Sequence, residues 1–310
     1  MNNFERLMHY FVRYFTHSST RFVVHSKLGL YKNLSDRKYL EKSYKAYMKI
    51  PLNLDDPKRY TEKLQWIKLY DRNPAYTEMV DKYAVKKYVA EKIGEEHIIK
   101  SIGVWDSADD IDFDKLPDKF VLKCTHDSGP VICKDKSKFN KKAAIKKLNK
   151  HLRTDFAEIG KEWPYKNVKR RVIVEEYMVD EKTSELRDYK FFCFNGEVKC
   201  FKIDFDRQTD HKANWYTPEG EFLDIATAVP NDASRKLEMP ETLDKMLECA
   251  ALLSEGIPFL RVDFYEANGQ MYFGELTFFN GNGVSKFNDD KWDFLLGDWI
   301  ELPPKREETV

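Results

Sequence analysis

The 310-residue chain has no excess of either charge, because its 52 basic side chains balance its 52 acidic ones. A neutral chain is not drawn as a whole to nucleic acid, so any site for a polyanion has to be local. We therefore expect no nucleic-acid partner. Apolar residues make up 42% and aromatic residues 14% of the sequence. That content suffices for a large core and for two or three domains.

Cysteine is scarce, and its spacing argues against the common metal sites. The five cysteines are odd in number and form no CxxC pair and no zinc-binding Cys/His pattern. They stand at positions 124, 133, 193, 200 and 249. We interpret them as reduced, structural thiols of a cytosolic protein.

Long apolar runs are missing as well. Arg6, Arg13, Arg21 and Lys27 interrupt residues 1–30, so no stretch there approaches the ~18 apolar residues that a membrane span needs. No secretory signal is present either. We therefore expect a cytoplasmic protein.

The sequence also lacks the common motifs of nucleotide binding and of nucleophilic catalysis. It has no GxxxxGK[ST] loop, no GxGxxG after a strand and no GxSxG elbow. If this chain binds a nucleotide, it must therefore do so by another kind of site.

The N-terminal residues nevertheless carry a regular pattern. Apolar side chains recur at helical spacing, which predicts an amphipathic helix with a basic second face; they are Phe4, Leu7, Met8, Phe11 and Phe15. Such a helix can lie on the inner face of a membrane or pack on the domain behind it, and we favour packing. Further on, Thr77 to Ile93 predicts one helix that ends at Gly94 and carries Lys82.

Two strands with a tight turn between them form a possible flap. Phe120–Cys124 and Val131–Cys133 predict the strands, and the turn between them contains Ser128 and Gly129. Backbone N–H groups of such a turn can lie over phosphates, and Lys123 stands just before it. Many ordinary hairpins share this pattern. Residues 134–153 follow with nine basic side chains against one acidic, either as a solvated lid helix or as a cradle for a polyanion.

The middle of the chain predicts a buried strand and a hairpin. Val172 to Met178 ends in Glu175, Glu176, Tyr177 and Met178, and an extended segment of this kind can bind an adenine edge with its backbone. Asp188–Phe194 and Glu197–Ile203 flank Asn195-Gly196, the strongest hairpin signal in the sequence. Asp204 to Tyr216 reads as a polar loop containing Lys212.

A second hairpin, from Arg261 to Gly283, carries two carboxylates. Asp263 and Glu275 can face each other across it, with Arg261 two residues away on the same face. Carboxylates on neighbouring strands suit a hard cation such as Mg²⁺, held together with phosphate oxygens. The alternative is an exposed, charged face of an antiparallel pair.

Taken in order, these segments resemble the TupA-like ATP-grasp family over roughly residues 60–285. The matching segments are KLQWIKLYDRNP (63–74), DKYAVKKYV (81–89), FVLKCTHDSG (120–129), VIVEEYM (172–178), DYKFFCFNG (188–196), RVDFY (261–265) and FGELTFFNGNG (273–283). The resemblance implies an α+β ATP-grasp fold in which two subdomains clasp a nucleotide. It implies this division: helical N-terminal extension (1–75), first core segment (76–119), lid subdomain (120–178), core subdomain with the metal site (179–301) and tail (302–310).

The resemblance also implies roles for individual residues, with ATP and Mg²⁺ as cofactors. Lys82 and Lys123 resemble the lysines at the phosphates, beside the turn with Ser128 and Gly129, and residues 175–178 look like the adenine hinge. Lys212 matches a basic residue near the γ-phosphate, and Arg261 one near the transferred phosphoryl group; these two are the predicted catalytic residues. Asp263 and Glu275 match the metal ligands. Thr277 replaces the usual asparagine ligand, and Asn280 or Asn282 is expected to substitute for it.

The activity that the resemblance implies is that of an ATP-dependent carboxylate–amine ligase working through an acylphosphate. Family members are associated with surface polysaccharides, so the expected partners are an acidic glycan or other carboxylate and an amine. Two alternatives stay open: a glycosyltransferase that uses a sugar nucleotide, and an assembly component with a degenerate nucleotide site.

Overall fold

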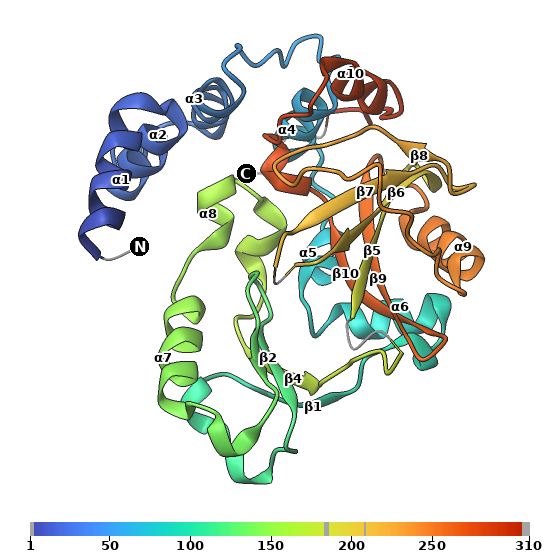
Figure 1. Cartoon of the computed structure of the whole chain (residues 1–310). Coiled ribbons are helices and arrows are strands. Elements are labelled where there is room, and N and C mark those ends of the chain that lie inside the picture. The colour runs from blue at the N-terminus through green and yellow to red at the C-terminus, as the bar shows by residue number, and fades with distance from the viewer. Residues whose placement is uncertain (1–2, 183–185, 208, 306–310) are drawn as a thin grey trace. The chain divides into compact units, whose positions relative to one another are not determined.

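The computed structural model describes residues 3–182, 186–207 and 209–305. The chain divides into two compact units (Figure 1). The first unit combines Met1–Arg72 with Phe279–Val310, and the second is Asn73–Phe278.

The first unit is helical. Its elements are α1 (Asn3–Thr16), α2 (Ser18–Lys27), α3 (Asp36–Met48), α4 (Tyr60–Tyr70), the short turn η6 (Asn280–Gly283) and α10 (Asp290–Asp298). The C-terminal helix α10 packs on α4. Buried Asp293 accepts hydrogen bonds from the backbone N–H of Thr61 at 3.0 Å and from its hydroxyl at 2.9 Å. These bonds join the two distant parts of the sequence.

Helix α1 corrects one expectation from the sequence. Met8, Phe11 and Phe15, which we expected to pack on the domain behind the helix, are exposed. The helix contacts α2 through Tyr14 instead, whose hydroxyl lies 3.1 Å from Nε2 of His25. None of the helices in the described ranges is both long and apolar enough to cross a membrane.

The second unit begins with a helix that is broken where the sequence predicts continuity. The predicted helix from Thr77 to Ile93 consists of α5 (Ala75–Val80) and α6 (Val85–Ile93). The break arises because the Asp81 side chain accepts hydrogen bonds from the backbone N–H groups of Tyr83 at 2.8 Å and Ala84 at 3.1 Å. Lys82, within the break, donates its backbone N–H to the carbonyl of Thr125 at 3.0 Å, which fixes Lys82 beside the flap.

The smaller sheet holds the flap. Its antiparallel order is β1-β4-β2-β3. The strands are β1 (Ser101–Trp105), β2 (Phe120–Cys124), β3 (Val131–Cys133) and β4 (Val172–Glu176). Helix α7 (Lys141–Leu152) packs against it, because Leu148 belongs to one buried cluster with Phe120, Leu122 and Val174.

Short helical segments complete this part of the chain. They are η1 (Glu95–His97), η2 (Ala108–Asp110), η3 (Phe113–Lys115), η4 (Lys136–Lys138), α8 (Phe156–Gly160) and η5 (Trp163–Asn167).

The larger sheet is antiparallel, in the order β10-β9-β5-β6-β7-β8. Its strands are β5 (Arg187–Phe194), β6 (Glu197–Phe205), β7 (Lys212–Tyr216), β8 (Phe222–Leu223), β9 (Leu260–Ala267) and β10 (Gln270–Thr277). Helix α9 (Leu243–Ser254) contacts β5, β6 and β9 through buried Met246, Ala250 and Leu253 (Figure 1). Because side chains alternate between the two faces of a sheet, polar residues of the same strands can point to the face opposite α9.

The predicted loop from Asp204 to Tyr216 is wrong at both ends. Asp204 lies within strand β6, which ends at Phe205, and Lys212 to Tyr216 form strand β7, whose Trp215 lies opposite Lys202. Asn214 is fully buried there because its side-chain amide donates to the carbonyl of Asp232 at 2.8 Å. Because the side chain of Asn214 forms its hydrogen bond with the backbone, it can be buried in a strand, although a polar residue in the sequence suggested a loop.

The two predicted hairpins are confirmed. Asn195 and Gly196 join β5 to β6, and Asn268 and Gly269 join β9 to β10; all four residues have positive φ angles between 50° and 87°. Asn and Gly adopt this conformation at low cost, which is why these dipeptides mark tight hairpins.

Candidate nucleotide site

Two adjoining cavities lie within the second unit. One has a volume of about 370 Å³ and walls rich in charged groups. The other, of about 410 Å³, is more apolar. The cavities adjoin, because they share six wall residues: Ile99, Lys123, Pro130, Glu175, Arg207 and Tyr265.

The polar cavity concentrates the charges of both sheets. Its basic side chains are Lys82, Lys86, Lys123, Lys190, Arg207 and Arg261. Its acidic side chains are Asp127, Glu175, Asp188, Asp263 and Glu275. Most of these groups are paired with one another, and the six cations against five carboxylates leave a surplus of positive charge for an anionic ligand.

Arg261 and the two hairpin carboxylates form the centre of this cavity. Asp263 lies directly opposite Glu275 in the β9–β10 register. Arg261 donates from Nε to Oδ1 of Asp263 at 2.7 Å, and from Nη2 to Oδ2 of Asp263 and Oε1 of Glu275, both at 2.8 Å. Lys82 adds an ion pair to the second oxygen of Glu275 at 3.2 Å. The sequence predicted the facing carboxylates but not that cations already pair with both.

Burial and charge oppose each other at this centre. Burial alone would lower the pKa of Arg261, but the carboxylates of Asp263 and Glu275 outweigh it and raise that pKa. Burial would raise the pKa of Glu275, yet Lys82 and Arg261 hold it far below its usual value. The Glu275 side chain is still 38% exposed, because one side of it faces the cavity. It is therefore an ionised carboxylate that a ligand can reach.

Lys190 and Asp188 belong to the same cluster, and the sequence analysis missed both. Lys190 on β5 lies opposite Asp263 on β9, and its Nζ is 2.9 Å from Oδ2 of Asp263 and also pairs with Asp188. Burial lowers the pKa of Lys190, but Asp263 and Asp188 more than compensate, so the pKa is raised. The available signal was the alternation Asp188-Tyr189-Lys190, which puts two charges on one face of a buried strand.

Glu175 joins the flap to the helix before it. Its carboxylate accepts from Nζ of Lys123 at 2.6 Å and pairs with Nζ of Lys86 at 2.5 Å. Lys123 lies on β2, diagonally across from Glu175 on β4, because Val121 is the direct register partner of Glu175. Burial would raise the pKa of Glu175, but the two lysines lower it below the usual value. Burial likewise lowers the pKa of Lys86, and Glu175 offsets this only in part.

We expect this arrangement to appear in the acid stability of the protein. Because the folded pKa of Glu175 is depressed, its charge stabilises the fold above its unfolded pKa of about 4.3, and this contribution is lost as the pH falls through the folded value. Below about pH 4.3, the unfolding free energy of Glu175→Gln should therefore depend less steeply on pH than that of the wild type. The difference in slope is at most about 1.4 kcal/mol per pH unit. Urea unfolding from pH 6 to pH 3 measures this pH dependence, and Glu197→Gln, at an exposed residue, is the control. Identical acid profiles for Glu175→Gln and wild type would contradict the pairing.

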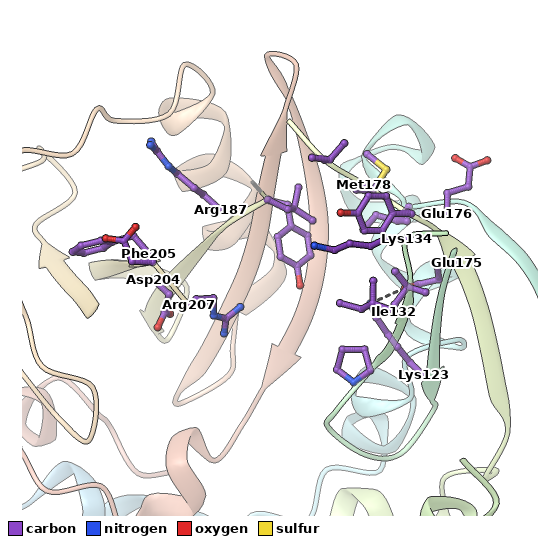
Figure 2. A pocket seen from close by; sticks show the side chains of 18 residues that line it. Lys123, Ile132, Lys134, Glu175, Glu176, Met178, Arg187, Asp204, Phe205 and Arg207 are labelled. Carbon is purple, nitrogen blue, oxygen red and sulfur yellow. Dashed lines mark ion pairs between the residues drawn. The ribbon is translucent and has the colours of Figure 1, made fainter. Parts of the chain in front are cut away.

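The apolar cavity takes its walls from both sheets. Figure 2 shows Lys123, Ile132, Lys134, Glu176 and Met178 on one side, and Arg187, Asp204, Phe205 and Arg207 on the other. Glu176, the last residue of β4, and the three residues after it, Tyr177, Met178 and Val179, line this cavity. Apolar side chains beside an extended backbone segment suit a flat heteroaromatic ring.

The turn of the flap reaches the polar cavity. Asp127, Ser128 and Gly129 line it, and Gly129 has a φ of 109°, which favours glycine. Buried Asp127 pairs with His151 of α7; burial raises the pKa of Asp127, and His151 counteracts this. The turn is thereby tied to the helix behind it.

Three residues that the sequence offered for the site do not line these cavities in the described parts of the chain. Lys212 pairs with Asp210 at 3.2 Å, and it is absent from the walls of either cavity as far as residues 3–182, 186–207 and 209–305 define them. Asn280 and Asn282 belong to η6 in the first unit, where the Asn282 carbonyl accepts from Lys68 at 2.9 Å. The roles of Lys212 and Asn280 stay predictions.

The carboxylates fit Mg²⁺ only together with a ligand. Within the described parts of the chain, no three His, Cys, Asp or Glu side chains are grouped so as to hold a metal ion. Asp263 and Glu275 supply one facing pair of oxygen ligands. Mg²⁺ is commonly bound by one or two carboxylates, with phosphate and water oxygens completing its octahedron. The pair thus fits Mg²⁺ carried by a polyphosphate and does not form a protein-only metal site.

Comparison with known proteins identifies the family. Residues 62–301 match the family described as TupA-like ATPgrasp. The chain belongs to this family. This match confirms the predicted α+β ATP-grasp fold. In this TupA-like protein the fold consists of the two antiparallel sheets and the helices described above. The predicted subdomain boundaries stay predictions.

Solved structures show weaker similarities. They include D-alanine–D-alanine ligase from Bacillus anthracis (15% identity, TM-score 0.33, covering 70% of this chain and 58% of that chain). An L-amino acid ligase from Bacillus licheniformis has 15% identity and a TM-score of 0.40, over 66% of this chain and 44% of that one. This TupA-like protein thus spans about half the length of these two ligases. No curated protein sequence matches it, and TM-scores of this size carry no argument about its activity.

Proposed function

We propose that this TupA-like protein is an ATP-dependent carboxylate–amine ligase. The observation that carries the proposal is the junction of the two cavities at Lys123 and Glu175. An apolar space beside residues 176–179 suits adenine. The adjoining space, with its surplus of lysine and arginine and its facing carboxylates, suits a triphosphate with Mg²⁺.

In the proposed reaction, a substrate carboxylate oxygen attacks the γ-phosphorus of ATP, and ADP leaves. The amine of the second substrate then attacks the acyl carbon of the acylphosphate; inorganic phosphate leaves, and the nitrogen loses a proton to give an amide. Mg²⁺, when bound, neutralises charge on the phosphate oxygens. The chain's own contribution is placement and charge, so the absence of a nucleophile motif agrees with the proposal.

Each group of residues has a role in this scheme. Lys123 and Lys82 bind phosphate oxygens, and Arg261 stabilises the charge that spreads over the transferred phosphoryl group. Asp263 and Glu275 would hold the metal, and Lys190 orients Asp263 and, with Arg261, counteracts the rise that burial causes in its pKa. The turn with Ser128 and Gly129 covers the phosphates and excludes water, which would hydrolyse the acylphosphate. Lys212 is proposed to approach the γ-phosphate when substrate is bound.

For the substrates, we propose an acidic glycan or its precursor, such as a uronic acid, and an amino acid or other amine. These substrates are the ones that the resemblance in sequence implies, and the structural support is a set of exposed lysines on α7, at positions 142, 146, 147 and 150. These positive charges would hold an acidic acceptor near the flap.

Glu275→Gln tests the metal assignment. We expect ADP formation to fall about a hundredfold, because an amide removes one of the two charges that bind the metal. The fold should persist, since the amide can still accept from Arg261. Glu197→Gln, at the exposed first residue of β6, is the matched control. ADP formation at the wild-type rate by Glu275→Gln would show that Glu275 is not a metal ligand.

A further inference from the structure

The N-terminal helix exposes its apolar face. Helices in soluble domains normally turn this face to the core, but Met8, Phe11, Val12 and Phe15 of α1 are between 46% and 63% exposed. They occupy positions i, i+3, i+4 and i+7 and so form one continuous stripe. Leu28 and Leu30, after α2, are 69% and 63% exposed.

A basic cavity of about 460 Å³ lies between α2 and α3 of the same unit. Its ionisable side chains are Arg21, His25, Lys42, Lys45 and Lys49, with Tyr31 beside them, and no acidic residue is among the described residues that line it. Residues 1–50 carry ten Lys and Arg against three Asp and Glu. Since the whole chain is neutral, this positive charge is concentrated at the N-terminal end.

The apolar stripe and the basic cavity adjoin. Arg21, in the cavity wall, donates from Nη1 to the carbonyls of Tyr14 at 3.2 Å and Phe15 at 2.8 Å. The exposed Leu30 directly precedes Tyr31, which also lines the cavity. Apolar side chains and cations therefore occupy neighbouring positions on one part of the surface.

We propose that α1, α2 and α3 form a docking surface for an anionic lipid bilayer. Exposed Phe, Met and Leu side chains enter the boundary between headgroups and acyl chains, while adjacent Lys and Arg pair with lipid phosphates. Charge complementarity decides the partner, because a second copy of this strongly basic region would repel the first. The observations behind this inference do not depend on the proposed ligase activity. If the surface binds a bilayer, the protein acts at a membrane.

Vesicle flotation with the full chain tests the docking surface. We expect salt-sensitive binding to phosphatidylcholine vesicles that contain phosphatidylglycerol, and little binding to phosphatidylcholine alone. Lys42→Ala with Lys45→Ala should weaken binding about 25-fold, since each basic side chain near the surface contributes about fivefold. Phe11→Ser with Phe15→Ser should abolish it. The controls are Leu252→Ser, an exposed apolar residue on α9, and Lys115→Ala with Lys138→Ala, two lysines outside the N-terminal region.

We expect each variant to fold, because all the substituted side chains are at least partly exposed. Circular dichroism checks this. Equal binding to neutral and anionic vesicles, or equal binding by wild type and the Lys42/Lys45 variant, would overturn the proposal. So would the absence of any binding. A dimer in sedimentation experiments that Phe11→Ser with Phe15→Ser dissociates would show that a second copy covers the stripe, which also overturns it.

Discussion

Arg261→Ala should lower the rate of ATP turnover about a thousandfold. The guanidinium joins Asp263 to Glu275 through three hydrogen bonds of 2.7 to 2.8 Å, and in the proposed reaction it meets the charge of the transferred phosphoryl group. Its loss removes that charge and also leaves Asp263, which is 1% exposed, with one cation fewer. We therefore also expect a loss of stability of about 3–5 kcal/mol.

Arg261→Lys separates the two effects. Lysine keeps the positive charge but cannot donate a bidentate pair, so the variant should unfold near the wild-type temperature and still turn over ATP well below the wild-type rate. Phosphate release at saturating Mg²⁺-ATP, with unfolding followed by circular dichroism, measures both quantities. Full activity in Arg261→Lys would contradict a catalytic role, and full activity in Arg261→Ala would contradict the site itself.

Lys190→Met should destabilise the second unit by about 3–5 kcal/mol, because it leaves buried carboxylates without their shared cation. The Lys190 side chain is 8% exposed and lies 2.9 Å from Asp263, while Asp188 also pairs with it. For a unit of this size the midpoint of thermal unfolding should fall by about 10 °C. Lys199→Met, whose partner Glu197 is exposed, is the control and should stay within about 0.5 kcal/mol of wild type.

A double variant tests whether the loss of stability in Lys190→Met is electrostatic. Adding Asp263→Asn to Lys190→Met removes one of the two negative charges that Lys190 compensates, so the double variant should be more stable than the sum of the two single losses implies. Denaturant unfolding of the four proteins gives the coupling. Losses that simply add would show that Lys190 contributes packing and not charge compensation.

Local patterns in the sequence were enough to predict both hairpins. Alternating strands around Asn195-Gly196 and Asn268-Gly269 indicate the turn type and the register next to the turn. A register shift between Phe273 and Glu275 then brings Glu275, and not Gly274, opposite Asp263. These features depend on residues close together in the chain.

Features that depend on distant pairings escaped prediction. Lys190 meets Asp263 only because β5 pairs with β9 across some seventy residues, and nothing local in either strand specifies that partner. The break between α5 and α6 follows from one side-chain cap at Asp81, which competes with helix continuation. In α1 the periodicity predicted a helix correctly, but periodicity does not specify what covers the apolar face.

One measurement tests the central claim most directly: phosphate release from Mg²⁺-ATP by the purified protein, with a panel of uronic acids and amino acids. The account predicts release that requires both a carboxylate and an amine, and that Glu275→Gln reduces about a hundredfold. It would be contradicted by phosphate release that needs neither substrate, or by release of UDP or GDP from a sugar nucleotide without ATP.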